Sequence, residues 1–245
     1  MKMAVALVLA ALSGATQAIA ADTGQIPAPL LKVGDSWTLN ETVEGSSSSF
    51  KRTQFKQTLE RIDSDRMFVA VQVVDAPAAP QTRMLNLDWS SNLMVDGEEK
   101  PAGRPLSFPL QVGNSWTADW TDPRRLGNQL KVHAHTTYKV VGWEDVNVPA
   151  GVFHALKIEA RGFADADVVI PSVAQSTALG GAGSATSVSR AQTGGRGVMH
   201  LTTIDLIYYA PEMKRAIKTV AEQYNEVGTM TGRTTVELVA FQSGK

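Results

Sequence analysis

Residues 108–118, FPLQVGNSWTA, nearly repeat residues 29–39, PLLKVGDSWTL, with six of eleven positions identical and an Asp/Asn exchange at a seventh. The two copies lie 79 residues apart. Each copy of an internal repeat is expected to form the same supersecondary unit with the same buried face. We therefore predict a single domain, residues 21–245, built from two repeats at about residues 29–107 and 108–241.

The repeated motif has the chemistry of a chain corner. Gly34 and Gly113 allow a positive φ, and the Asp or Asn that follows tolerates a turn while its side chain bonds local backbone. Trp37 and Trp116 come next, where a large ring covers one end of a core as a strand begins. The motif predicts two turns, two strand starts and two buried rings, with direct ligand contact as the alternative role of the tryptophans.

Most of the chain alternates apolar and polar residues with period two, as in the row Met67, Val69, Val71 and Val73. Turn residues separate the alternating runs, and strands joined by tight turns are antiparallel. Strands are predicted at residues 50–62, 67–74, 83–88, 129–143, 152–161, 198–209, 215–224 and 233–241. Residues 215–227 also match helical spacing, so a helix is the rival interpretation there.

The predicted fold class is all-β, with two internally duplicated antiparallel meanders. Their apolar faces must be buried either against each other or inside one bent sheet, so the architecture is a curved sheet, a half-barrel or a sandwich.

Gly, Ala, Ser and Thr dominate residues 171–197, which contain no aromatic residue. Such a composition buries too little apolar area to offset its ordering entropy. It predicts a flexible insertion, and a lid over a cavity is the alternative.

The first twenty residues have the pattern of a secretory signal peptide. Lys2 precedes an apolar run from Met3 to Leu12, and Ala18-Ile19-Ala20 fits a cleavage site. The run is too short to cross a bilayer, which needs about 20 apolar residues. We expect cleavage near Ala20, a periplasmic or secreted product, and no transmembrane span in the mature chain.

Composition excludes several classes of partner and site. The chain has 23 Lys and Arg, 24 Asp and Glu, and no cysteine. Since nucleic-acid binding needs clustered basic residues, which are missing, no nucleic-acid partner is expected. Without cysteine there are no disulfides and no thiolate metal sites.

No catalytic motif stands out, so we expect no catalytic residues, no cofactor and no enzymatic activity. His133 and His135 lie two apart on a predicted strand, and both rings would face one side, as in a metal-binding pair. No third ligand lies at suitable spacing, so no metal site is predicted and the two imidazoles are expected to be solvated.

Aromatic side chains are the predicted ligand contacts, because flat rings cover acyl chains and stack on sugars. Trp116 and Trp120 share strand parity, and the set consists of Trp37, Trp116, Trp120, Trp143 and Tyr209. The predicted function is a non-enzymatic periplasmic protein that binds an apolar or amphiphilic envelope ligand such as a lipid. The alternatives are a scaffold that docks to an envelope protein through sheet edges or residues 171–197, and a hydrolase.

Three segments carry a family resemblance: Val146–Glu159 with V-P-A-G-V-F, Tyr208–Arg215 with Y-A-P, and Thr235–Leu238. Together with the corner motif they resemble a broad group of exported bacterial β-rich proteins of unknown function. In that group V-P-A-G-x-F joins two strands and Y-A-P-x-x-G leads into the next strand. This chain has Met213-Lys214 where the second motif ends in glycine, so the resemblance does not itself imply a tight turn there.

Overall fold

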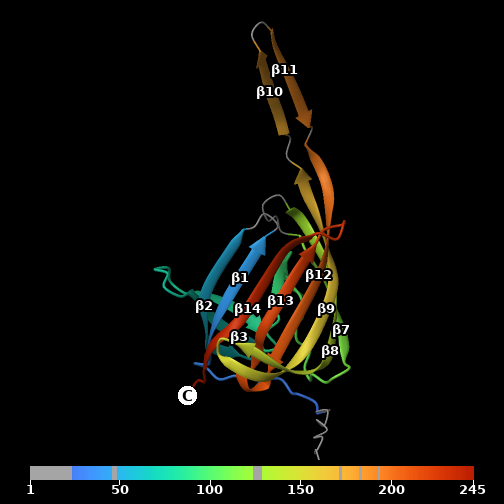
Figure 1. Cartoon of the computed structure of the whole chain (residues 1–245). Coiled ribbons are helices and arrows are strands. Elements are labelled where there is room, and N and C mark those ends of the chain that lie inside the picture. The colour runs from blue at the N-terminus through green and yellow to red at the C-terminus, as the bar shows by residue number, and fades with distance from the viewer. Residues whose placement is uncertain (1–23, 46–48, 124–128, 171–172, 182–183, 193) are drawn as a thin grey trace, which may run out of the picture.

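The structure is a computed structural model that describes residues 24–45, 49–123, 129–170, 173–181, 184–192 and 194–245 (Figure 1). The predicted signal peptide lies outside the described residues. No helix in the described part of the chain has the length and apolar character needed to cross a membrane.

The described residues form strands and one short 3-10 turn, η1 (Pro211–Met213). The strands of the first repeat are β1 (Ser36–Gly45), β2 (Phe50–Asp63), β3 (Arg66–Val73), β4 (Gln81–Asn86), β5 (Asn92–Val95) and β6 (Glu98–Pro101). Those of the second are β7 (Ser115–Asp122), β8 (Gln129–Val148), β9 (Gly151–Ile170), β10 (Val173–Gly181), β11 (Ser184–Gln192), β12 (Gly195–Ala210), β13 (Arg215–Tyr224) and β14 (Met230–Gln242).

Ten strands form one open antiparallel sheet in the order β4-β3-β2-β1-β14-β13-β12-β9-β8-β7. Each repeat contributes a meander, and the pairing of β1 with β14 joins the meanders edge to edge. The all-β prediction is confirmed, and both repeats share a single curved sheet (Figure 1). Residues 215–224 form a strand, as the period-two pattern indicated, and not the rival helix.

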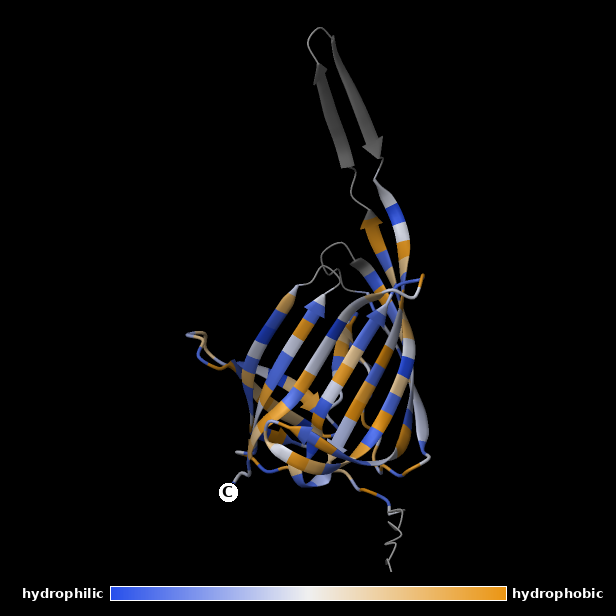
Figure 2. Cartoon of the chain, viewed as in Figure 1, coloured by the Kyte–Doolittle hydropathy of each residue, from blue (hydrophilic) through white to orange (hydrophobic). Residues whose placement is uncertain are grey.

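Apolar and polar residues alternate along most strands, which gives the sheet its banded hydropathy (Figure 2). Because successive side chains point to opposite faces, this alternation lets one face of the curved sheet be buried while the other meets solvent.

The two copies of the repeated motif are structurally equivalent. Gly34 and Gly113 both have φ of 91°. Gly34 N donates to Leu59 O at 2.8 Å, and Gly113 N donates to Val140 O at 2.9 Å. The accepting strand bulges directly after that residue in both copies. Each corner therefore docks on the second strand of its own repeat.

The corners differ at their Asp/Asn position. Asn114 is exposed, whereas Asp35 is fully buried. The Asp35 carboxylate accepts hydrogen bonds from Lys32 N (2.8 Å), Lys214 Nζ (2.7 Å) and Gly244 N (2.8 Å). The first corner thereby ties the start of β1 to the η1 turn and to the C-terminal segment.

Burial alone would raise the pKa of Asp35, but the hydrogen bonds from Lys214, Gly244 and Lys32 outweigh it and hold the pKa below its ordinary value. A carboxylate with a lowered pKa in the folded state stabilises the fold above about pH 4. That contribution is lost as the pH falls through the folded-state pKa.

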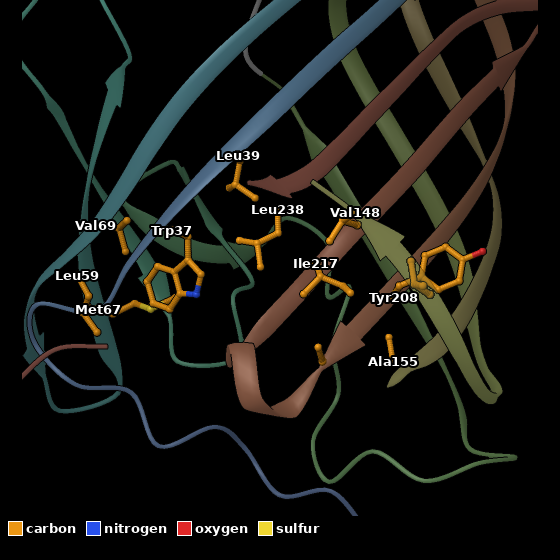
Figure 3. Close-up of a cluster of buried hydrophobic side chains, with 12 residues drawn as sticks. Trp37, Leu39, Leu59, Met67, Val69, Val148, Ala155, Tyr208, Ile217 and Leu238 are labelled. Carbon is orange, nitrogen blue, oxygen red and sulfur yellow. The ribbon is translucent and has the colours of Figure 1, made fainter. Parts of the chain in front are cut away.

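Two hydrophobic clusters form the core. The first surrounds Trp37 and Leu238, and the tip of the β8–β9 hairpin joins it through Val148 (Figure 3). The second is made by inward-facing residues of β8, β9 and β12, including Val140 and Ile158. Residues 106–110, which link β6 to β7, cover this second cluster with Leu106, Phe108 and Leu110.

Two hairpins were not predicted as strands. One is the β5–β6 hairpin, which contacts strands near both ends of the sheet. Its Glu99 pairs with Arg66 of β3. Its Val95 and Lys100 line a hollow together with residues of β7. The other is β10–β11, within the predicted flexible insertion at 171–197. Long paired strands β9 and β12 lead into this segment and bring its two halves into register, which composition alone does not reveal.

Exchanging the corner residues tests the role of Asp35. We expect Asp35→Asn to lower the free energy of unfolding by about 3 kcal/mol at pH 7, because Lys214 would keep a part-buried charge without its carboxylate. The reciprocal Asn114→Asp, at an exposed corner, should stay within about 0.5 kcal/mol of wild type. Urea denaturation measures both, and equal effects would contradict the assignment.

Candidate ligand-binding cavity

A cavity of about 230 Å3 lies where the two repeats meet on the covered side of the sheet. Its walls are mostly apolar or aromatic and include Leu85, Trp89, Leu106, Ile207 and Ala216. Strands β2 and β4, the β6–β7 link, β12 and β13 all contribute to it. No histidine or carboxylate is among the described residues that line it.

Arg215, the first residue of β13, brings a charge to this cavity. Its Nη1 donates to Gln57 Oε1 at 2.7 Å, and its guanidinium carbon lies 4.6 Å from the centroid of the Trp89 ring. Among the described residues, no carboxylate oxygen lies within the 4.0 Å of an ion pair with this guanidinium. The side chain keeps part of its accessible surface, as expected for a group enclosed by protein yet open to a cavity.

Burial lowers the pKa of Arg215 to about 9, so the guanidinium stays protonated at pH 7. No carboxylate contributes to this shift. A charge that is partly withdrawn from water without a counter-ion lowers the stability of the fold.

Three contacts hold the turn that precedes Arg215. Trp37 Nε1 donates to Met213 O at 2.8 Å, Trp89 Nε1 donates to Lys214 O at 2.9 Å, and Lys214 pairs with Asp35. Lys214 has a left-handed backbone conformation with φ of 61°. That conformation costs about 1 kcal/mol, which the ion pair offsets, so the tight turn forms without glycine.

Asp205 is a second ionisable group on the inward side of β12. It pairs across the sheet with Ala160 and Ala221, and burial raises its pKa to about 6. Burial, and then the charge of Asp205, raise the pKa of Tyr138 to about 12. The interior is therefore not uniformly apolar.

A larger hollow of about 530 Å3 lies near the β2–β3 turn and the β4–β5 link. Both arginines that line it have a carboxylate partner, since Arg66 pairs with Glu99, and Arg104 pairs with Asp88 at 3.1 Å, although Nε of Arg66 has no hydrogen-bond partner in the described part of the chain. The smaller cavity, with its uncompensated guanidinium, is the better candidate for a binding site.

Four of the five predicted contact residues serve the core or the β6–β7 link. Trp37 is fully buried, edge-on to Trp89 at 5.0 Å. Trp116 stacks on Tyr138 and donates to Arg104 O at 2.8 Å, and the Trp120 indole faces Gly103. Tyr209 is buried and lies edge-on to Phe108 at 5.4 Å.

The fifth, Trp143, stacks on His154 with ring centroids 5.1 Å apart. The structure therefore does not gather the predicted rings into one site. Of the five predicted residues, only Trp37 lies near Arg215: its ring centroid is 5.5 Å from the guanidinium carbon.

The histidines lie on exposed parts of the strands, each beside an aspartate on a neighbouring strand. The pairs are His133 and His135 with Asp119, His154 with Asp145, and His200 with Asp165. Within the described residues, no group of three or more His, Cys, Asp or Glu is arranged to hold a metal ion.

Arg215 and Asp205 are the residues that the sequence reasoning missed. Arg215 begins the strand that contains Ile217, and Asp205 stands two residues before Ile207 in the same alternating row. A charged residue in the row that faces a core is the signal that identifies them, because such a residue must be satisfied inside the protein.

Chemically, this cavity offers apolar walls for an uncharged body and one hydrogen-bonding cation.

No family model matches the sequence, and a search of curated proteins likewise gives no match. Among solved structures, the chain is similar to a putative lipoprotein from Parabacteroides distasonis, with 10% identity over 89% of this chain and 97% of that chain and a TM-score of 0.45. A putative exported protein with YmcC-like fold from Bacteroides fragilis has 12% identity over 90% and 100%, with a TM-score of 0.41. The hypothetical lipoprotein YmcC from Escherichia coli has 9% identity over 83% and 84%, with a TM-score of 0.30. Similarity at this level establishes neither a common family nor a common activity.

Asp205 gives the interior a pH dependence with a definite sign. Its folded-state pKa of about 6 lies above the ordinary 3.8, so the native protein holds a proton that the unfolded chain loses. Stability therefore falls as the pH rises from about 4 to 6, and the cost persists above that window. Asp205→Asn should raise the free energy of unfolding by about 1–2 kcal/mol at pH 7.5, allowing for partial exposure, and by almost nothing at pH 4.

Denaturation at the two pH values measures this difference. Asp167→Asn on β9 is the matched control, since Asp167 is exposed and should show no such change between pH 4 and 7.5. A pH-independent effect of Asp205→Asn would contradict the interpretation.

Proposed function

We propose that this protein is a non-enzymatic binding protein of the bacterial cell envelope that holds an apolar or amphiphilic ligand in the cavity between its repeats. The observation that carries the proposal is the cavity itself, with apolar walls drawn from both halves of one curved sheet. The export signature at residues 1–20 supports the envelope location.

The size of the cavity limits the ligand. Ligand cavities commonly measure about 300–1,000 Å3, and this one holds about 230 Å3. It suits a small amphiphile, or the headgroup end of a longer one.

Both repeats line the cavity. The first repeat contributes Leu85, Trp89 and Leu106, and the second contributes Ile207 and Ala216. A ligand bound there would contact both meanders, and would stabilise the folded protein by mass action.

A second role, docking to an envelope protein, is favoured by the β10–β11 hairpin, which pairs with no other strand in the described part of the chain. Ile170 and Gly195 are directly paired, so residues 171–194 can be replaced by an Asn-Gly turn. If docking is the role, the shortened protein should lose co-purification with its envelope partner and keep its ligand affinity and Tm. Unchanged co-purification would exclude the hairpin as the docking element.

Filling the cavity tests the binding proposal. Thr219 lines the cavity, and Thr219→Trp should lower the affinity for a fluorescent fatty acid and for neutral N-phenyl-1-naphthylamine at least tenfold, since the indole would occupy the space. Titration of delipidated mature protein measures both affinities.

Thr202→Trp is the control, because Thr202 lies exposed on β12 and the same ring there fills no cavity. It should bind both probes like wild type. Failure of the wild-type protein to bind either probe, or any envelope lipid extract, would refute the proposal.

A further inference from the structure

We propose that the ligand carries an anionic group, a carboxylate or a phosphate, and that Arg215 binds this group inside the cavity. The inference rests on the proposed function and adds the chemical class of the ligand.

The first argument is the charge balance around two successive residues. Lys214 and Arg215 leave the same turn, yet Lys214 reaches the buried carboxylate of Asp35 at 2.7 Å, while Arg215 has no carboxylate partner among the described residues. The chain supplies acids to other arginines, as in the pairs of Arg233 with Glu222 at 2.6 Å and of Arg104 with Asp88. Arg215 is thus a part-buried cation that has no carboxylate partner within the described chain.

The second argument is the set of free donors. A guanidinium has five N–H groups in a planar fork that matches a carboxylate or phosphate. In Arg215, Nη1 donates once to Gln57 and Nε donates once to Ala216 O at 3.3 Å. Nη2 has no partner in the described residues, so a hydrogen of Nη1 and those of Nη2 remain for an anion. These two nitrogens form the end of the fork, which allows bidentate binding.

The third argument is that the guanidinium is pre-organised. Trp89 covers it at 4.6 Å and Gln57 holds one nitrogen, while the turn before it is fixed by the Trp37 and Trp89 indoles. Little side-chain freedom is left to lose when an anion binds.

The apolar walls of the cavity indicate that the anionic group is attached to a hydrocarbon part of the ligand. Leu85, Leu106, Ile207 and Ala216 line the same cavity, and they offer contact to hydrocarbon and no hydrogen bond from their side chains. A free inorganic anion would leave these walls unused. The geometry therefore points to an anionic amphiphile.

The test compares ligands of one tail length and different headgroups. Octanoate, octyl phosphate, 1-octanol and inorganic phosphate are titrated into wild-type protein by calorimetry. We expect octanoate and octyl phosphate to bind at least tenfold more tightly than 1-octanol, and inorganic phosphate to bind more weakly than octyl phosphate.

Arg215→Met keeps an apolar side chain of similar length and removes the charge. It should lose at least tenfold in affinity for octanoate and octyl phosphate, and change less than threefold for 1-octanol. Arg52→Met, at an exposed position on β2, should match wild type. The Tm of unliganded Arg215→Met should equal or exceed that of wild type, because an uncompensated buried charge is removed, and this verifies folding.

The outcomes separate the two proposals. If wild type binds octanoate and 1-octanol equally, or if Arg215→Met retains full affinity for octanoate, the role of Arg215 is overturned while cavity binding stands. If inorganic phosphate binds as tightly as octyl phosphate, the amphiphilic part of the inference is overturned. If wild type binds none of these ligands and neither dye, the proposed function fails and the inference fails with it.

Discussion

The buried ion pair between Asp35 and Lys214 is the interaction on which the architecture depends. It joins the first corner of one repeat to the turn between β12 and β13 of the other, and the Asp35 carboxylate also holds Gly244 near the C-terminus. The pairing of β1 with β14, which joins the two repeats, begins directly after Asp35, where Ser36 pairs with Gln242. Because a buried carboxylate is costly unless its oxygens are bonded, this corner is stable only when both repeats and the C-terminal segment are assembled.

The same turn positions the candidate site. Lys214 is fixed by Asp35, and the indoles of Trp37 and Trp89 bind the carbonyls of Met213 and Lys214. The next side chain, Arg215, then enters the cavity. The tryptophans of the first repeat therefore act on the site indirectly, by holding the backbone from which the guanidinium projects. The exposed Asn114 of the second corner makes no comparable link to any residue that the structure describes.

Much of the fold was predictable because its signals are local. Alternation located the long strands, including Arg215–Tyr224, and the repeated Val-Gly-[Asp/Asn]-Ser-Trp motif located two equivalent corners. The β10–β11 hairpin was not predicted, since its pairing is imposed by β9 and β12 more than by its own composition. The aromatic site was predicted as one set, yet Trp116 and Trp120 lie against the β6–β7 link and Trp143 stacks on His154. Strand parity tells which rings share a face, but not which segment crosses that face.

By itself, the sequence determined the all-β fold class, the positions of most strands of the large sheet and the likeness of the two corners, because alternation and turn chemistry depend on neighbouring residues. Only the tertiary structure decided that both repeats join one sheet through β1 and β14, that the β6–β7 link covers the core, and that Asp35 meets Lys214. It alone showed that Arg215 lines a cavity and has no carboxylate partner among the described residues. Charge compensation is a property of contacts between residues far apart in the chain, and these contacts exist only once the sheet has curved and brought its strands together.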